Sequence, residues 1–113
     1  PFRASFASGK SIRWSRVHRL PDFVHFNHSI HVAKGIGCAS CHGSIDKMNL
    51  VNQASPLTME WCLDCHRAPE KHVRPREEVF NMNYVARNQE TLGPELVRRY
   101  GIRKVTHCSA CHY

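Results

Sequence analysis

The chain has 113 residues, of which 42% are hydrophobic and 9% aromatic, and its formal net charge is +7. This length allows one small domain with a limited core, and no apolar run is long enough to span a bilayer. The mixed composition excludes collagen, coiled coils and low-complexity disorder. No basic and apolar leader follows Pro1, so we expect that an export signal has been removed or that the chain is a fragment.

An N-terminal arm and one domain are predicted. Residues 1–20 are basic and polar, which favours an arm or linker, and residues 21–113 are expected to form one domain. A short strand is predicted at 23–26. The glycines at both ends of 35–37 are expected to turn the chain.

Two helices are predicted in the second half. Thr58 is a suitable cap for a helix that carries Trp61. A polar, irregular stretch is expected over 74–88. The sequence Gly-Pro-Glu at 93–95 predicts the start of a last helix, with proline in its first turn, and Gly101 its end.

All six cysteines belong to three copies of one motif, C-x-x-C-H. The copies are Cys38, Cys41 and His42; Cys62, Cys65 and His66; and Cys108, Cys111 and His112. This motif is the attachment signature of c-type haem, in which the two thiols bind the vinyl groups and the histidine is an iron ligand. We therefore predict three covalently bound haem c groups.

Other uses of the cysteines explain this pattern less well. A zinc site could use two C-x-x-C pairs, but three pairs do not divide into four-thiolate sites, and no histidine would be required after each pair. A disulfide framework also leaves the histidines unexplained, and a thioredoxin-like pair needs a βαβ context that is absent here.

The basic charge does not require a nucleic-acid partner. The lysines and arginines are scattered and lack the interleaved aromatics of a base-stacking surface. Three haems would add roughly six negative charges through their propionates, which nearly balances the protein. We therefore expect no nucleic-acid binding, and we expect porphyrin faces packed with Trp14, Trp61, leucines and valines to form most of the core.

The supply of distal iron ligands distinguishes an electron carrier from an enzyme, because an iron with two protein ligands is closed to substrate. His28 and His31 are three residues apart, so on one helical turn they point to nearly the same side and can reach two neighbouring haems. The third distal ligand stays open among His72, Met59, Met82 and His18. Candidate ligands outnumber the haems, so the chain is not expected to be an enzyme by itself.

The residues F-x-H-x-x-H followed by C-x-x-C-H resemble the class III multihaem cytochromes c, including the small trihaem members. The resemblance implies a mostly irregular fold with a few short α-helices, organised around three covalent haems. It also implies bis-histidine ligation, with His28 on the first haem and His31 on a neighbour.

A second likeness, over residues 11 to about 82 and the final motif, is to the pentahaem subunit of bacterial alternative complex III. It is carried by residues 14–24, 35–38, 56–67 and 72–75. That family has five haem motifs, so three motifs would make this chain its C-terminal portion or a shortened relative. In the first case His18 could reach a haem attached outside these residues.

The second likeness implies an electron-relay subunit of a membrane-bound quinol:electron-acceptor oxidoreductase. The chain would be peripheral, on the periplasmic side of the bacterial inner membrane. Its partners would be the quinol-oxidising membrane subunits, with a further cytochrome c or an oxidase as acceptor. The alternative is a free periplasmic trihaem shuttle. A subunit is expected to expose an apolar patch that includes Phe2, Phe6 and Trp14, whereas a shuttle would fold these residues back.

Overall fold

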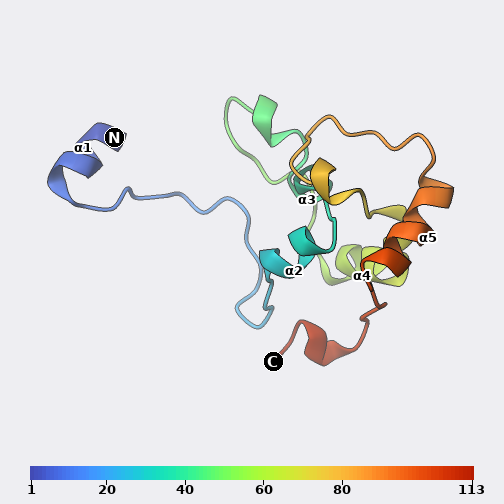
Figure 1. Cartoon of the computed structure of the whole chain (residues 1–113). Helices are drawn as coiled ribbons and strands as arrows, with labels where there is room; N and C mark the ends of the chain where they lie inside the picture. The colour runs from blue at the N-terminus through green and yellow to red at the C-terminus, as the bar shows by residue number, and fades with distance from the viewer.

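The computed structural model describes residues 1–113 as short helices joined by irregular segments (Figure 1). The α-helices are α1 (Phe2–Ser8), α2 (His28–Ala33), α3 (Cys38–His42), α4 (Met59–Arg67) and α5 (Gln89–Arg99). The 3₁₀ helices are η1 (Ile45–Lys47), η2 (Pro69–Lys71), η3 (Arg76–Glu78) and η4 (Cys108–Ala110). This architecture confirms the predicted fold class of irregular chain with a few short helices. None of the helices is both long and apolar enough to cross a bilayer.

The strand predicted at 23–26 is wrong. The only β-type pairing in the chain is an isolated antiparallel bridge between Ile36 and Val73. Within 23–26, the His25 N–H donates to the carbonyl of Cys111 at 2.8 Å. A single backbone hydrogen bond holds the segment near the C-terminal motif, but it does not continue into the ladder that defines a strand.

Residues 1 to about 14 extend away from the rest of the molecule, with α1 at the far end, and the chain returns to the body by His18, which contacts His42 (Figure 1). The structure adds a helix that the sequence did not predict, and Gly9 closes it with φ of 65°. Phe2, Phe6 and Trp14 are 75%, 88% and 84% exposed. The expectation that Trp14 belongs to the core is therefore wrong, because its segment has no packed surface beneath it. The division at residue 20 stays a prediction.

The two helices of the second half are confirmed, although one boundary differs. The Thr58 hydroxyl accepts a hydrogen bond from the Trp61 N–H at 3.4 Å, as expected of a cap. Helix α5 begins at Gln89, four residues before the predicted start at Gly93. A Cβ at position 93 would collide with the carbonyl oxygen of Glu70. Gly93 is thus required for close packing of α5 on η2, and it does not mark a helix start.

The aliphatic core is small and lies between α5 and the chain just after η2. Val73, Leu96 and Tyr100 are its buried members, and only nine of the 113 residues are buried in total. The Arg74 N–H donates to the carbonyl of Gly35 at 2.8 Å, beside the bridge between Ile36 and Val73. This connection fixes the turn that leads from α2 into α3.

Candidate haem centres

The local structure of each motif follows from its spacing. Helix α3 consists of the first motif, α4 carries the second, and η4 carries Cys108 of the third, with Cys111 directly after its end. In a helix, cysteines three residues apart lie on one face, and the histidine that follows lies one turn from the first cysteine. Each motif can therefore present two sulfurs and one imidazole to the same side.

The sulfurs of the three motifs gather in one region of the body. All six cysteines are free thiols. Burial, and next the nearby thiols of Cys41 and Cys62, together raise the pKa of Cys65 to about 11. Burial also raises the pKa of Cys62, and the next contribution comes from Cys111 of the third motif. One thiol from each motif thus lies within electrostatic reach of another motif, so the three attachment sites are neighbours.

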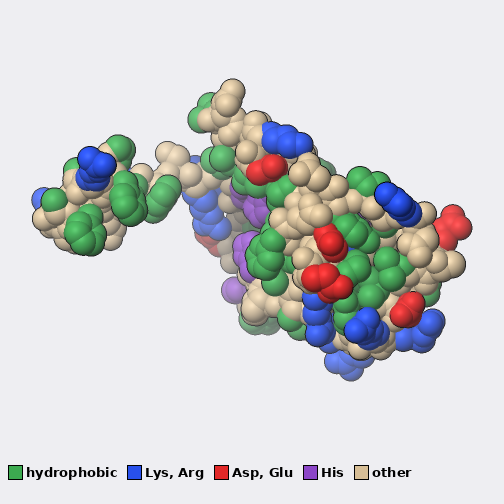
Figure 2. Space-filling view, turned by 45° about the horizontal axis from the view of Figure 1, so that its top comes forward, with side chains coloured by type: hydrophobic (Ala, Val, Ile, Leu, Met, Phe, Trp, Pro, Cys, Tyr) green, Lys and Arg blue, Asp and Glu red, His purple; other side chains and the backbone are tan.

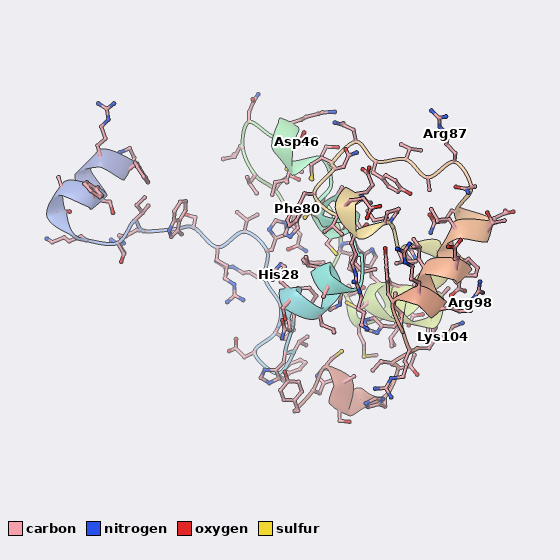
Figure 3. All side chains as sticks on the ribbon, viewed as in Figure 1. His28, Asp46, Phe80, Arg87, Arg98 and Lys104 are labelled. Atoms are coloured by element: carbon pink, nitrogen blue, oxygen red, sulfur yellow. The ribbon has the colours of Figure 1, made fainter.

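Helix α2 presents a histidine to each of the first two motifs. His28 lies on α2 (Figure 3). Its imidazole lies 6.3 Å from that of His42 between ring centroids, and the ring planes differ by 6°. The imidazole of His31 lies 6.1 Å from that of His66, and these planes differ by 68°. The structure therefore pairs His28 with the first motif and His31 with the second.

These separations fit iron held between two imidazoles. Two metal–nitrogen bonds of about 2 Å, with about 1 Å from each nitrogen to its ring centroid, give a centroid separation of about 6 Å. Both histidine pairs match this value, so the residues present fit a haem iron with two axial imidazoles.

Helix α2 is held in place by the residue before it. The Asn27 side chain accepts a hydrogen bond from the Ser29 N–H at 2.8 Å and caps the helix. The Asn27 carbonyl lies 2.8 Å from Nδ1 of His31 and accepts a hydrogen bond from it when that nitrogen carries the proton. This arrangement leaves Nε2 of His31 available for a metal. Burial lowers the pKa of His31, which favours the neutral imidazole that binds metals.

The third motif is anchored differently. Nδ1 of His112 lies 2.9 Å from the carbonyl oxygen of Phe23. The ring centroids of His112 and Phe23 are 5.7 Å apart. The ring of His25 stacks on Tyr113 at 4.5 Å. These contacts orient the imidazole of His112 from one side. None of the hydrogen bonds or ring contacts of His112 involves a candidate distal ligand.

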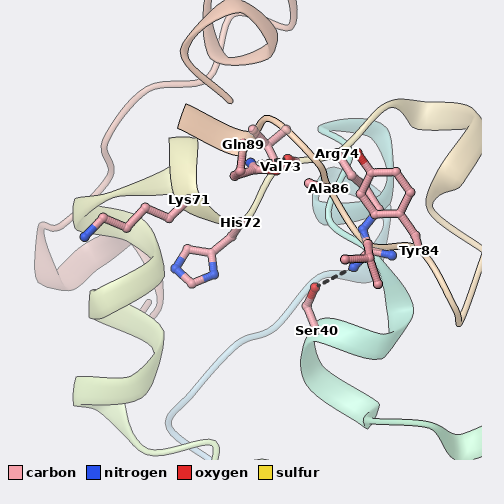
Figure 4. Close-up of a pocket in the computed structure, with 9 residues that line it drawn as sticks. Ser40, Lys71, His72, Val73, Arg74, Tyr84, Ala86 and Gln89 are labelled. Carbon is pink, nitrogen blue, oxygen red and sulfur yellow. Dashed lines mark hydrogen bonds between the residues drawn. The ribbon is translucent and has the colours of Figure 1, made fainter. Parts of the chain in front are cut away.

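Neither His72 nor Met59 is among the residues that contact His112. His72 lines a cavity of about 320 Å³ beside Ser40 of the first motif (Figure 4). Met59 begins α4 and is 68% exposed. The structure therefore does not bring either residue together with the third motif, and the identity of the third distal ligand stays a prediction.

Arg74 is a site residue that the sequence did not reveal. Its guanidinium is buried, donates to the Ser40 hydroxyl at 3.4 Å and to the Asn81 carbonyl at 3.2 Å, and lies over the Tyr84 ring (Figure 4). Its Nε has no partner and no acidic side chain pairs with it. A buried cation without a counter-charge is costly, so this position fits an anionic group such as a haem propionate.

Histidine side chains reach the surface where the arm joins the body, and basic side chains are spread around the body (Figure 2). Together, the short helices, the grouped thiols and the facing imidazoles define a small multihaem cytochrome c.

The particular family is given by comparison with known proteins. Residues 24–113 match the family described as cytochrome c7 and related cytochrome c, and the chain belongs to this family. A comparison with curated proteins finds no match. Members of the family are electron-transfer proteins with covalent haem c and are typically periplasmic. The match includes all three motifs and α2, and it excludes the N-terminal arm.

Proposed function

We propose that the chain carries three haem c groups and relays electrons as a subunit of a membrane-bound, quinol-oxidising respiratory complex. Membership of the cytochrome c7 family makes it a multihaem electron-transfer protein. The observation that carries the arrangement of two centres is that His28 faces His42 and His31 faces His66. The third centre is supported by the third motif, which has the same two cysteines and histidine.

The residues have distinct roles in this function. The cysteine pairs would fix each group covalently, and His28 with His42 and His31 with His66 would hold iron at the first two sites, which would leave no position there for substrate. Bound haem iron supplies reversible one-electron oxidation and reduction. The neighbouring positions of Cys41, Cys62 and Cys111 keep the three attachment sites close together. The chain therefore positions redox centres and needs no acid, base or nucleophile.

The N-terminal arm favours a subunit over a free shuttle. Phe2, Phe6 and Trp14 are each at least three-quarters exposed. Burying large aromatic side chains against a partner is favourable, and such residues are enriched in the centres of interfaces. We infer that this patch docks on another subunit at the periplasmic side of the inner membrane. The electron donor would be a membrane quinol-oxidising subunit, and the acceptor a further cytochrome c or an oxidase.

The test has two parts. Mass spectrometry of the mature protein should show three haem additions, and replacing both Cys108 and Cys111 with Ala should remove one of them. Fractionation should then place the wild-type protein with quinol-oxidising membranes. A variant with Phe2, Phe6 and Trp14 replaced by Ser should be released with its haem spectrum unchanged.

Other results of these experiments would favour the free periplasmic shuttle or contradict the three proposed centres. A wild-type protein that is fully soluble, loaded with three haems and reducible by a small periplasmic donor would support the free shuttle. Fewer than three haem additions in the wild type would contradict the proposed set of centres. As a matched control, replacing Arg3 with Ser changes an exposed residue of the same helix and should leave membrane association intact.

A further inference from the structure

A third histidine touches the proximal ligand of the first motif. Nε2 of His18 lies 3.3 Å from Nδ1 of His42, and the two rings meet edge to face with centroids 4.5 Å apart. His18 comes from the irregular segment between the arm helix and α2, and its side chain is half-buried. It lies outside residues 24–113, which match the family.

The separation shows that His18 is not the distal ligand opposite His42. Two imidazoles on opposite sides of one iron need centroids about 6 Å apart. The 4.5 Å separation from His18 is too short for an iron between the rings, whereas the 6.3 Å separation from His28 fits. The contact of His18 is with the Nδ1 edge of His42, which is the nitrogen left over when Nε2 binds metal.

The position of the proton follows from this geometry. If Nε2 of His42 holds the iron, Nδ1 must carry a proton and can only donate. Nε2 of His18 then accepts this hydrogen bond, and the proton of His18 sits on its own Nδ1. The corresponding Nδ1 atoms of His31 and His112 face backbone carbonyls, at 2.8 and 2.9 Å. His42 differs because its acceptor is a side chain.

We propose that His18 is a positioning residue for the first haem, which accepts a hydrogen bond from Nδ1 of His42 and thereby lowers the reduction potential of that haem. An acceptor on the second nitrogen of a metal-bound imidazole fixes the ring and makes it a stronger electron donor. A stronger donor stabilises the oxidised iron. This inference rests on the ligation of His42 within the proposed function.

The experiment compares three variants of the haem-loaded protein by potentiometric titration followed by EPR. His18→Phe keeps an aromatic ring and removes the acceptor, His18→Gln retains an acceptor oxygen, and Val17→Ala is a control on the same segment. In His18→Phe the reduction equilibrium constant of one low-spin haem should rise about tenfold, which is about 59 mV for a one-electron couple. The Gln variant and the control should stay close to the wild type.

Two results would overturn the proposal. One is a His18→Phe protein in which all haems stay low-spin and no potential changes. The other is the appearance of a high-spin haem in His18→Phe, because His18 would then itself be an iron ligand. A failure of the proposed ligation is recognised separately: His28→Ala would leave every haem low-spin, whatever the result at position 18.

Discussion

The first two C-x-x-C-H motifs face one short helix, whereas the third lies against the extended segment that precedes this helix. His28 and His31 of α2 stand opposite the histidines of the first two motifs. The third motif meets the same region only through the Phe23 carbonyl and the His25 N–H. A short stretch before the first motif therefore provides facing imidazoles for two sites and backbone anchors for the third.

The largest expected effect is the loss of one iron ligand. Replacing His28 with Ala should convert one haem from low-spin to high-spin, and replacing His31 with Ala should convert a different one. EPR and visible spectra of the ferric protein measure both changes. Ser29→Ala, between them on α2, is the matched control and should stay low-spin. A fully low-spin His28→Ala protein would show that this residue is not a ligand.

A comparable effect is expected from the third distal ligand. Between His72 and Met59, we expect His72 to supply it, because His72 lines a cavity beside Ser40 and because imidazoles already face the other two motifs. His72→Ala should then create a high-spin haem and Met59→Ala should not, as measured by the same spectra. An absorption band typical of sulfur ligation that disappears in Met59→Ala or Met82→Ala would show that methionine is the ligand instead.

A smaller effect is expected from Arg74. Replacing it with Met removes the donor to the Ser40 hydroxyl and the Asn81 carbonyl. The free energy of unfolding of the haem-loaded protein should fall by about 1–3 kcal/mol, as expected when buried hydrogen bonds are lost. Thermal or denaturant unfolding measures the change. Arg87→Met, at an exposed arginine, should have almost no effect, and equal stability of both variants would contradict the role of Arg74.

Loss of the cap of α2 should lower the free energy of unfolding by a still smaller amount. Asn27→Ala removes the side chain that accepts from the Ser29 N–H, and loss of such a cap costs about 1 kcal/mol. Asn27→Asp retains an acceptor and should restore stability. If both variants unfold like the wild type in denaturant, the cap does not contribute to holding α2.

The smallest expected effect is a difference between two EPR signals of the wild-type protein. The ring planes are nearly parallel in the pair of His28 and His42 and nearly perpendicular in the pair of His31 and His66. The relative orientation of axial imidazoles governs the splitting of the iron orbitals, so we expect two distinct low-spin EPR signals. The signal lost in His28→Ala should be the more rhombic one. Identical signals from both sites would contradict the difference in ring orientation.

Sequence alone predicted those features that depend on local spacing. The three C-x-x-C-H motifs are read directly from the spacing of cysteines and histidines, and the helix of the second motif was predicted from its cap. The cap at Thr58 and the spacing of His28 and His31 are equally local. Membership of the cytochrome c7 family agrees with the haem chemistry inferred from the motifs. The link to alternative complex III stays a proposal.

Features that depend on contacts between distant segments were missed. The sequence predicted that the last helix starts at Gly93, but α5 begins at Gln89. Gly93 is needed because it packs against Glu70, and local sequence does not reveal that contact. Trp14 was assigned to the core by its residue type, although its segment extends from the body. The contacts of His18 with His42 and of Arg74 with Ser40 likewise join residues 24 and 34 positions apart.

The brevity of α2 has a consequence for how the protein matures. Six residues, from His28 to Ala33, carry both facing imidazoles, so the helix cannot turn toward one site without moving at the other. If both imidazoles bind iron, as proposed, completion of one site would fix the helix and prepare the other. A chain arrested after one attachment should already hold the opposite imidazole near its final place.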